Sequence, residues 1–272
     1  MPKTLREEFP SVLDIAYSDY QKHMHVSEIM SPNVKMIEKD ATMLDAARIM
    51  GEHHIGSLLV DGWDRPSGII TERDLLTHVI AQNRDPKKVK VYEIMSPRLI
   101  TIRPHENIRD SAKTMIREKG RLVVMEGRKL LGIVTASDLV KSLPQVPETS
   151  VPLRKFMTRE VTFTTPDQKV IDAAKTMGKE RIGSLIVKKE GKPWGIFTER
   201  DLLTKVIYKG QSLSRSVSDF CSSPLIRIEL SASIHKAAKI MTEHHIRRLP
   251  VSDNEELSGI ITARDLVEAY AI

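Results

Sequence analysis

The pattern of apolar positions along the chain predicts a helix that recurs four times. Apolar or small residues at i, i+3, i+4 and i+7 form a helical face made of Met43, Ala46, Ala47 and Met50. The same face returns at 108–115, 170–177 and 234–241. Unbroken apolar runs follow these helices, such as those at 57–60 and 184–187, and they indicate strands buried on both faces. A further short strand is expected before each helix, around residues 34–37 in the first case.

A ten-residue stretch marks the place where the last strand of each unit runs into its last helix. Residues 195–204 read GIFTERDLLT, residues 68–77 read GIITERDLLT, and looser copies begin at Gly132 and Gly259. The threonines of the four copies are spaced by 64, 63 and 64 residues, which identifies one unit used four times. We expect each unit to run strand, helix, strand, strand, helix over about 60 residues, a length that is more stable in pairs. A shift of 127 residues superposes the first two units on the last two, so a pair of units was duplicated.

Each copy of the stretch has an aspartate three residues after its threonine. The plain interpretation is a capping box, in which the two side chains satisfy N–H groups at the start of a helix. The other interpretation is a nucleotide site, because an aspartate at a helix N-terminus can accept hydrogen bonds from a ribose and a neighbouring arginine can bind phosphate. All four copies keep the shorter Asp, and three place Arg beside it, at Arg73, Arg200 and Arg264. This combination favours a nucleotide site.

Composition narrows the class of protein. The chain has 272 residues, of which 40% are hydrophobic, enough for about two globular domains. Its one cysteine, Cys221, stands where related positions have Met30 and Met157, so we expect it to pack rather than react. A single cysteine excludes an internal disulfide and favours a reducing compartment. No run approaches 18 apolar residues and the N-terminus lacks a signal-peptide layout, so we expect a soluble cytoplasmic protein without contact to a membrane.

Charge, aromatic content, the histidine positions and the absence of a catalytic motif argue against nucleic-acid binding, a metal site and catalysis. The net charge of +6 is spread along the chain, and aromatic residues make up only 4%, which leaves little to stack on nucleic-acid bases. Nucleic-acid binding or a protein-interaction scaffold, with a basic surface, stays the alternative. The adjacent pairs His53-His54 and His244-His245 diverge on a helix by about 100° and cannot chelate together, so we expect no metal. No catalytic motif is recognisable, and we expect no enzyme.

Six segments are expected along the chain. They are an N-terminal extension at 1–23 with a roughly helical apolar period, repeat one at 24–81, repeat two at 90–143, a proline-containing linker at 144–151, repeat three at 152–208 and repeat four at 216–270.

This arrangement resembles tandem CBS (cystathionine-β-synthase) domains, two of which form a Bateman module. The resemblance covers about residues 24–270 and rests on the four Gly-h-h-Thr-x-x-Asp motifs, where h is apolar. It implies an α/β (α+β) fold of four repeats, paired into two pseudo-two-fold modules with two clefts each. In similar proteins the clefts bind AMP, ADP, ATP or S-adenosylmethionine, and the module regulates a partner. The resemblance therefore implies an adenine-nucleotide sensor without a catalytic domain or metal cofactor, acting on an unknown regulated protein, and we expect a homodimer.

The resemblance also assigns roles to individual residues. Ribose hydroxyls would bind Asp74, Asp138, Asp201 and Asp265, with Thr71, Thr135, Thr198 and Thr262 at the ribose or phosphate. Phosphates would lie near Arg73, Arg200 and Arg264, while Ser137 departs from this pattern, and a basic residue before the second strand would be Arg121, Arg247 or Arg248. Repeats one and three instead carry Ile55-Gly56-Ser57 and Ile182-Gly183-Ser184. There the glycine either lets a ligand approach the backbone or makes a tight strand entry, and both interpretations stay open.

Overall fold

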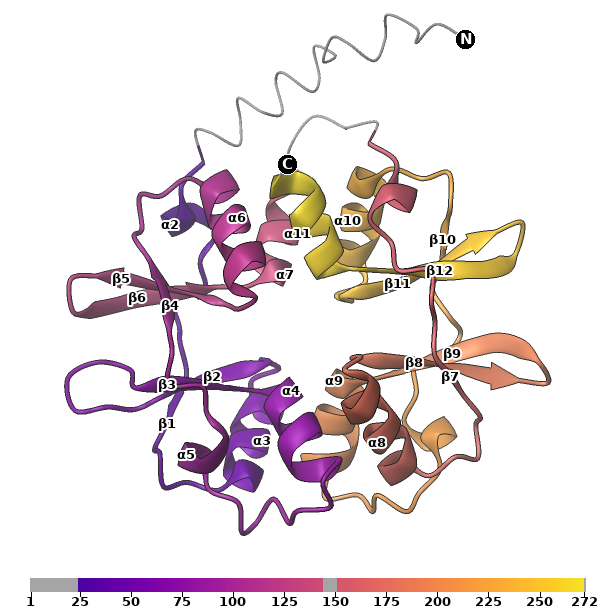
Figure 1. The fold of residues 1–272 in the computed structure, drawn as a ribbon, viewed down its shortest axis with the longest axis horizontal. Coiled ribbons are helices and arrows are strands. Elements are labelled where there is room, and N and C mark those ends of the chain that lie inside the picture. The colour runs from indigo at the N-terminus through magenta and orange to yellow at the C-terminus, as the bar shows by residue number, and fades with distance from the viewer. Residues whose placement is uncertain (1–23, 144–150, 272) are drawn as a thin grey trace, which may run out of the picture. The chain divides into compact units, whose positions relative to one another are not determined.

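The structure, a computed structural model, describes residues 24–143 and 151–271. The helix expected within residues 1–23 and nearly all of the expected linker lie outside the described residues. The described chain is a mixed α/β fold, and each repeat in it contributes one three-stranded sheet (Figure 1). The expected fold class is thereby confirmed.

Repeat one shows how the apolar pattern builds a unit. Strand β1 (Met36–Ile37) runs parallel to β2 (Ser57–Val60), and β2 pairs antiparallel with β3 (Gly68–Thr71). Helix α3 (Met43–Glu52) connects β1 to β2, and the predicted apolar face of this helix is buried. The predicted order of strand, helix, strand, strand and helix is confirmed, although the first strand is two residues shorter than expected.

The other repeats follow the same order with their own bounds. Repeat two contains β4 (Ile100–Ile102), α6 (Ile108–Glu118), β5 (Leu122–Glu126), β6 (Lys129–Val134) and α7 (Ala136–Ser142). Repeat three contains β7 (Phe163–Thr164), α8 (Val170–Glu180), β8 (Ser184–Lys189) and β9 (Lys192–Thr198). Repeat four contains β10 (Ile228–Glu229), α10 (Ile234–Glu243), β11 (Arg248–Asp253), β12 (Glu256–Thr262) and α11 (Ala263–Ala271).

The last helix of repeats one and three widens after its first turn. In repeat one, α4 (Glu72–Asp74) continues as the π-helix η2 (Leu75–Ile80), and in repeat three α9 (Glu199–Asp201) continues as the π-helix η5 (Leu202–Ile207). The hydroxyls of Thr77 and Thr204 each donate to the carbonyl four residues earlier, at 2.8 Å. Such side-chain bonds compete with the backbone ladder, but Thr176 in α8 and Thr242 in α10 form the same bond within regular α-helices, so this bond alone does not explain the wider turn.

The described residues form two compact units. The first unit comprises 24–33, 100–143, 151–160 and 227–271, and therefore joins repeats two and four. The second unit comprises 34–99 and 161–226, and joins repeats one and three. Each unit takes one repeat from each half of the chain, whereas the sequence pattern had suggested only the pairing of consecutive repeats.

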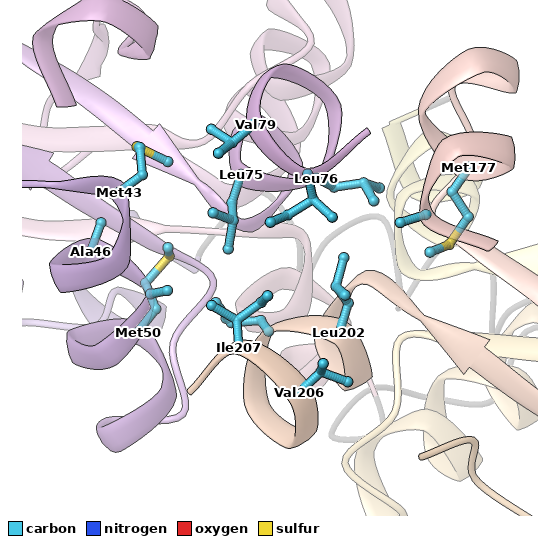
Figure 2. Packing of buried hydrophobic residues seen from close by; sticks show 14 of the residues in the cluster. Met43, Ala46, Met50, Leu75, Leu76, Val79, Met177, Leu202, Val206 and Ile207 are labelled. Atoms are coloured by element: carbon cyan, nitrogen blue, oxygen red, sulfur yellow. The ribbon is translucent and has the colours of Figure 1, made fainter. Parts of the chain in front are cut away.

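The core of the second unit is made by helices of repeats one and three. Helix α3 packs against η5, α8 packs against η2, and α4 meets α9 (Figure 1). Figure 2 shows Met50 close to Ile207, and Leu76 and Leu202 on the side of the cluster that faces Met177. Burying a side chain of this size stabilises a fold by about 1.5–3 kcal/mol, so the burial of this cluster is a main source of the unit's stability.

In the first unit, the C-terminal helix α11 packs against helices of repeats two and four. Helix α11 packs against α6, α7 and α10, and α10 also packs against α7. Tyr270 of α11 lines a small apolar pocket with Ile108, Leu139 and Leu143. Burial raises the pKa of the Tyr270 phenol far above its ordinary range, so this hydroxyl stays neutral.

A short segment near the start of each repeat adds a further pairing to the sheet of another repeat. In the second unit Ser96 pairs with Ile69 and Ser222 with Ile196; in the first unit Ser31 pairs with Ile133 and Thr158 with Ile260. These segments follow one helical turn each: α2 (Val26–Ile29), α5 (Val91–Ile94), η4 (Leu153–Lys155) and η6 (Val217–Asp219). The turn at α2 opens repeat one in the sequence, but it lies in the first unit, where the Val26 N–H donates to the Glu106 carbonyl at 2.9 Å.

Candidate functional site

The Thr–Asp pair of each repeat is a capping box at the junction of strand and helix. In every case the Asp Oδ2 accepts from the threonine N–H at 2.7–2.9 Å and from its hydroxyl at 2.6–2.8 Å. The pairs are Thr71–Asp74, Thr135–Asp138, Thr198–Asp201 and Thr262–Asp265. The predicted capping box is therefore confirmed. It uses one carboxylate oxygen, Oδ2, and leaves the other, Oδ1, for further contacts.

The neighbouring strand brings the other predicted residues to this junction. In the sheet register Ser57 lies opposite Thr71, Ser184 opposite Thr198, and Arg248 opposite Thr262. The carbonyls of Gly56, Gly183 and Arg247 accept from the first N–H of the following helix, at 3.2, 3.0 and 2.9 Å. Several N–H groups that the sequence suggested for a phosphate are thus hydrogen-bonded within the protein.

Gly56 supports the tight-entry interpretation. A Cβ added there would lie 3.1 Å from the Glu72 carboxyl group and 3.2 Å from Arg200, so the side-chain space is already taken. Ile55 and Ile182 beside the two glycines pack against the core of the second unit. Arg121 directly precedes β5.

Two serines that sequence reasoning missed approach the free side of the carboxylates. The Ser31 hydroxyl lies 3.4 Å from Asp138 Oδ1, and the Ser222 hydroxyl lies 3.4 Å from Asp201 Oδ1. Both belong to the segments that pair with the last strand of another repeat. The recurring Met-Ser-Pro at 30–32 and 95–97, with Ser-Ser-Pro at 222–224, is the signal that could have identified them.

The methionine before these serines, and the cysteine in its place, fill the space over a glycine. A Cβ added to Gly132 would lie 2.8 Å from Met30 Sδ, and one added to Gly195 would lie 3.4 Å from Cys221 Sγ. Burial, and secondarily the charge of Asp201, raises the pKa of the Cys221 thiol. A neutral, packed thiol agrees with the predicted packing role.

The arginines beside the aspartates reach into the other repeat of their unit. Arg200 donates to the His54 carbonyl at 2.9 Å, and its guanidinium lies 3.1 Å from Glu72 Oε2. Arg73 does the reverse, with the Arg181 carbonyl at 3.1 Å and Glu199 Oε2 at 3.4 Å. These carbonyls lie at the C-terminal ends of α3 and α8, where a cation is favourable. The two arginines therefore fasten repeats one and three together.

Arg264 follows the same pattern more weakly in the first unit. It donates to the Ile116 carbonyl, in the last turns of α6, at 3.4 Å. Repeat two has Ser137 at this position, and Ala136 and Ala263 replace the glutamates. The crossed pair of ion pairs thus belongs to the second unit.

Asp265 is the least compensated of the four carboxylates. Burial raises its pKa above the ordinary value, although its hydrogen bonds to Thr262 act in the opposite direction. Within residues 24–143 and 151–271, the structure gives its Oδ1 no hydrogen-bond donor. This oxygen can accept a donor from a ligand.

The paired histidines lie at helix ends. His53 and His244 are the C-caps of α3 and α10, and His54 and His245 take left-handed backbone conformations with φ of 53° and 54°. Across the described parts of the chain, no three His, Cys, Asp or Glu side chains are grouped to hold a metal ion. The helices of those parts also include none with the length and apolarity that crossing a membrane requires.

Comparison with known proteins identifies the repeats. A family model described as "CBS domain" matches residues 26–81, 91–145, 153–208 and 217–272. The uncharacterized protein MJ1404 of Methanocaldococcus jannaschii is 30% identical over 272 residues, covering 90% of this chain and 62% of that protein. The CBS domain-containing protein YhcV of Bacillus subtilis is 32% identical over 114 residues, covering 42% of this chain and 81% of that protein.

Other relatives extend the comparison to structure. Protein MK0525 of Methanopyrus kandleri, uncharacterized, is 37% identical over 128 residues, which make up 65% of its length. The chain thus spans a little under two thirds of MJ1404 and MK0525. The crystal structure of MJ1225 from M. jannaschii, proposed as an archaeal homolog of g-AMPK, aligns over 91% of this chain and 100% of that one with a TM-score of 0.76. At 22% identity this likeness supports the fold.

Proposed function

Because the chain belongs to the CBS domain family, we propose that it is a regulatory protein that senses an adenine nucleotide. It binds AMP, ADP, ATP or a related adenosyl compound such as S-adenosylmethionine, and acts on a separate partner protein without catalysing a reaction. A ligand regulates such a protein when its affinity differs between two conformations. We further propose that the active form is a homodimer and that the bounds of the four paired repeats are 24–81, 90–143, 152–208 and 216–270.

The observation that carries the proposal is that the two oxygens of a carboxylate have different hydrogen-bond partners. Each capping box holds the carboxylate in place through Oδ2. At Asp265 the other oxygen, Oδ1, has no hydrogen-bond donor among the described residues. A ribose offers two adjacent hydroxyl donors, which suits a fixed carboxylate oxygen. At Asp265 burial raises the pKa of the carboxyl group, and a ribose hydroxyl would supply its Oδ1 with a hydrogen-bond donor.

Phosphates have two sets of candidate partners. Arg121, Arg247 and Arg248 lie beside the second strand of repeats two and four, next to the capping boxes. Arg73, Arg200 and Arg264 are engaged at helix ends, so a phosphate there would have to share them. We therefore assign the phosphate contacts of repeats two and four to Arg121, Arg247 and Arg248 first.

Thermal unfolding of the full chain with each candidate ligand tests this function. A ligand at about 100 times its dissociation constant stabilises the protein by ~2.7 kcal/mol, which is a clear rise in melting temperature. We expect a rise with AMP, ADP, ATP or S-adenosylmethionine, and a smaller rise for the Asp265→Asn variant. If no adenosine compound stabilises the protein while a short DNA duplex binds it in a salt-dependent way, the basic-surface alternative replaces the sensor.

A further inference from the structure

The Asp201 carboxylate differs from the other three because a lysine follows it by four residues. Lys205 Nζ lies 2.6 Å from Asp201 Oδ1, and the Asp201 side chain is only 7% exposed. The residues at the same offset from the other aspartates are His78, Ser142 and Ala269. An ammonium group at this position is therefore particular to repeat three.

The lysine has an acceptor for each of its three N–H groups. Besides Asp201 Oδ1, the ammonium lies 2.8 Å from the Phe220 carbonyl and 3.1 Å from the Ser222 hydroxyl. Three donors with three acceptors leave this cation no unmet hydrogen bond. All four residues belong to the second unit. The contact is thus held from two segments, the π-helix η5 and the stretch after η6.

The Asp201 carboxylate likewise has a full set of hydrogen-bond donors. Its Oδ2 accepts from the Thr198 N–H and hydroxyl, and its Oδ1 accepts from Lys205 and from the Ser222 hydroxyl. A carboxylate accepts about four hydrogen bonds in total, so these donors fill Asp201. Asp265, with the same capping box, has no such donors at Oδ1 among the described residues. The two carboxylates therefore present opposite conditions to a ligand.

We propose that Lys205 closes the Asp201 position to adenosine ligands by occupying the carboxylate oxygen that a ribose hydroxyl would use. The inference rests on the proposed function, and it separates a closed position at Asp201 from the position at Asp265, whose Oδ1 has no donor among the described residues. A ribose at Asp201 would replace an ion pair by a hydrogen bond from a neutral hydroxyl and would leave the ammonium with two of its three acceptors, which is unfavourable. Repeat three then serves the unit as structure rather than as a ligand site.

Isothermal titration of the full chain with AMP tests the proposal. The Lys205→Met variant keeps the apolar stem and removes the ammonium, and we expect it to bind one more AMP per chain than the wild type. Lys209→Met is the matched control, because its exposed ammonium lies over the Tyr208 ring, 5.0 Å from the centroid, away from any carboxylate box. Asp201→Asn should leave AMP binding unchanged in the wild-type background and remove the added site in the Lys205→Met background.

Two titration results would contradict the closure of the Asp201 position by Lys205. The proposal is overturned if Asp201→Asn lowers the number of AMP molecules bound by the otherwise wild-type chain, or if Lys205→Met adds none while other sites fill.

A stability measurement without ligand tests the Lys205–Asp201 contact separately from the proposed nucleotide binding. The melting temperature of the Lys205→Met, Asp201→Asn double variant should fall by less than the sum of the two single falls, because the residues are in contact. Additive falls would overturn the lysine contact even if AMP binds elsewhere. Non-additive falls with no AMP, ADP, ATP or S-adenosylmethionine bound by the wild type or any variant would instead refute the nucleotide sensor, and the closed site with it.

Discussion

At the scale of single residues, Asp265 and Asp45 share one local geometry and differ in pKa. Asp45 forms a capping box with Thr42 at the start of α3, where the side-chain hydrogen bond from Thr42 lowers its pKa. Asp265 forms the same box with Thr262, but its burial raises its pKa. The same two hydrogen bonds therefore accompany opposite pH effects, and burial decides the sign.

We expect Asp265→Asn to stabilise the protein increasingly as pH rises. A carboxyl whose folded pKa is raised favours the folded state fully below its unfolded pKa of about 3.9, and loses this contribution as pH rises through the folded pKa. Asn caps a helix nearly as well and carries no charge. Chemical denaturation of both proteins at several pH values between about 4 and 7 would measure the difference.

Asp45→Asn provides the control of opposite sign. Its lowered pKa contributes stability above the unfolded value and loses it as pH falls, so this variant should be less stable than the wild type at neutral pH. If both variants change stability with pH in the same direction, burial does not govern Asp265.

A second residue-scale prediction concerns Arg248. A hydrogen bond to a charged group is worth about 1.5–3 kcal/mol, so Arg248→Ala should weaken AMP binding about tenfold or more. Adenosine, which has no phosphate, should be affected much less. Titration calorimetry with the two ligands measures both; an equal loss for AMP and adenosine would remove Arg248 from the phosphate contacts.

At the scale of elements, the arginines next to the motif act as cross-links between helices. Arg200→Met removes the guanidinium that pairs with the Glu72 carboxylate, which is only 1% exposed. Because Arg200 itself is partly exposed, we expect a loss of about 1–3 kcal/mol in the free energy of unfolding rather than the larger cost of a fully buried pair. Urea denaturation measures this loss.

Two further variants test the expected loss of stability in Arg200→Met. Adding Glu72→Gln to Arg200→Met should recover part of the stability, because it removes the stranded charge. Arg264→Met, whose bond to the Ile116 carbonyl is 3.4 Å long, should cost no more than about 0.5 kcal/mol. Equal costs for Arg200→Met and Arg264→Met would show that the ion pair with Glu72 contributes nothing.

The elements also show how far sequence reasoning extends. The period of Met43, Ala46, Ala47 and Met50 and the Thr–Asp spacing depend on neighbours a few residues apart, and both were predicted correctly. The widening of η2 and η5 was not predicted, and the threonine bonds found there do not distinguish these segments from the regular helices α8 and α10. Ser31 and Ser222 were missed because they reach their carboxylates from segments 107 and 21 residues away.

At the scale of the whole molecule, the distribution of charge between the repeats follows their places in the two units. Repeats one and three share the buried glutamates and their arginines, while repeats two and four have alanines there and keep basic residues before the second strand. The second unit is fastened by ion pairs, and the first has the basic residues to which we assign the phosphate contacts. This difference was readable in the sequence only as departures from a motif, since their meaning depends on which repeats meet.

The composition of the units has a consequence for cutting the chain. Each compact unit takes one repeat from either side of residues 144–150, so a break there leaves neither fragment with a complete apolar core. Residues 1–146 and 147–272, produced as separate polypeptides, should therefore recognise each other and reassemble when mixed, which co-purification through a tag on one fragment would detect. Since the 127-residue repetition gives both fragments equivalent helix faces, either fragment alone should associate with a second copy of itself. The chain behaves, in this sense, as a two-subunit assembly whose subunits have been joined end to end, and it is suited to use as a split reporter.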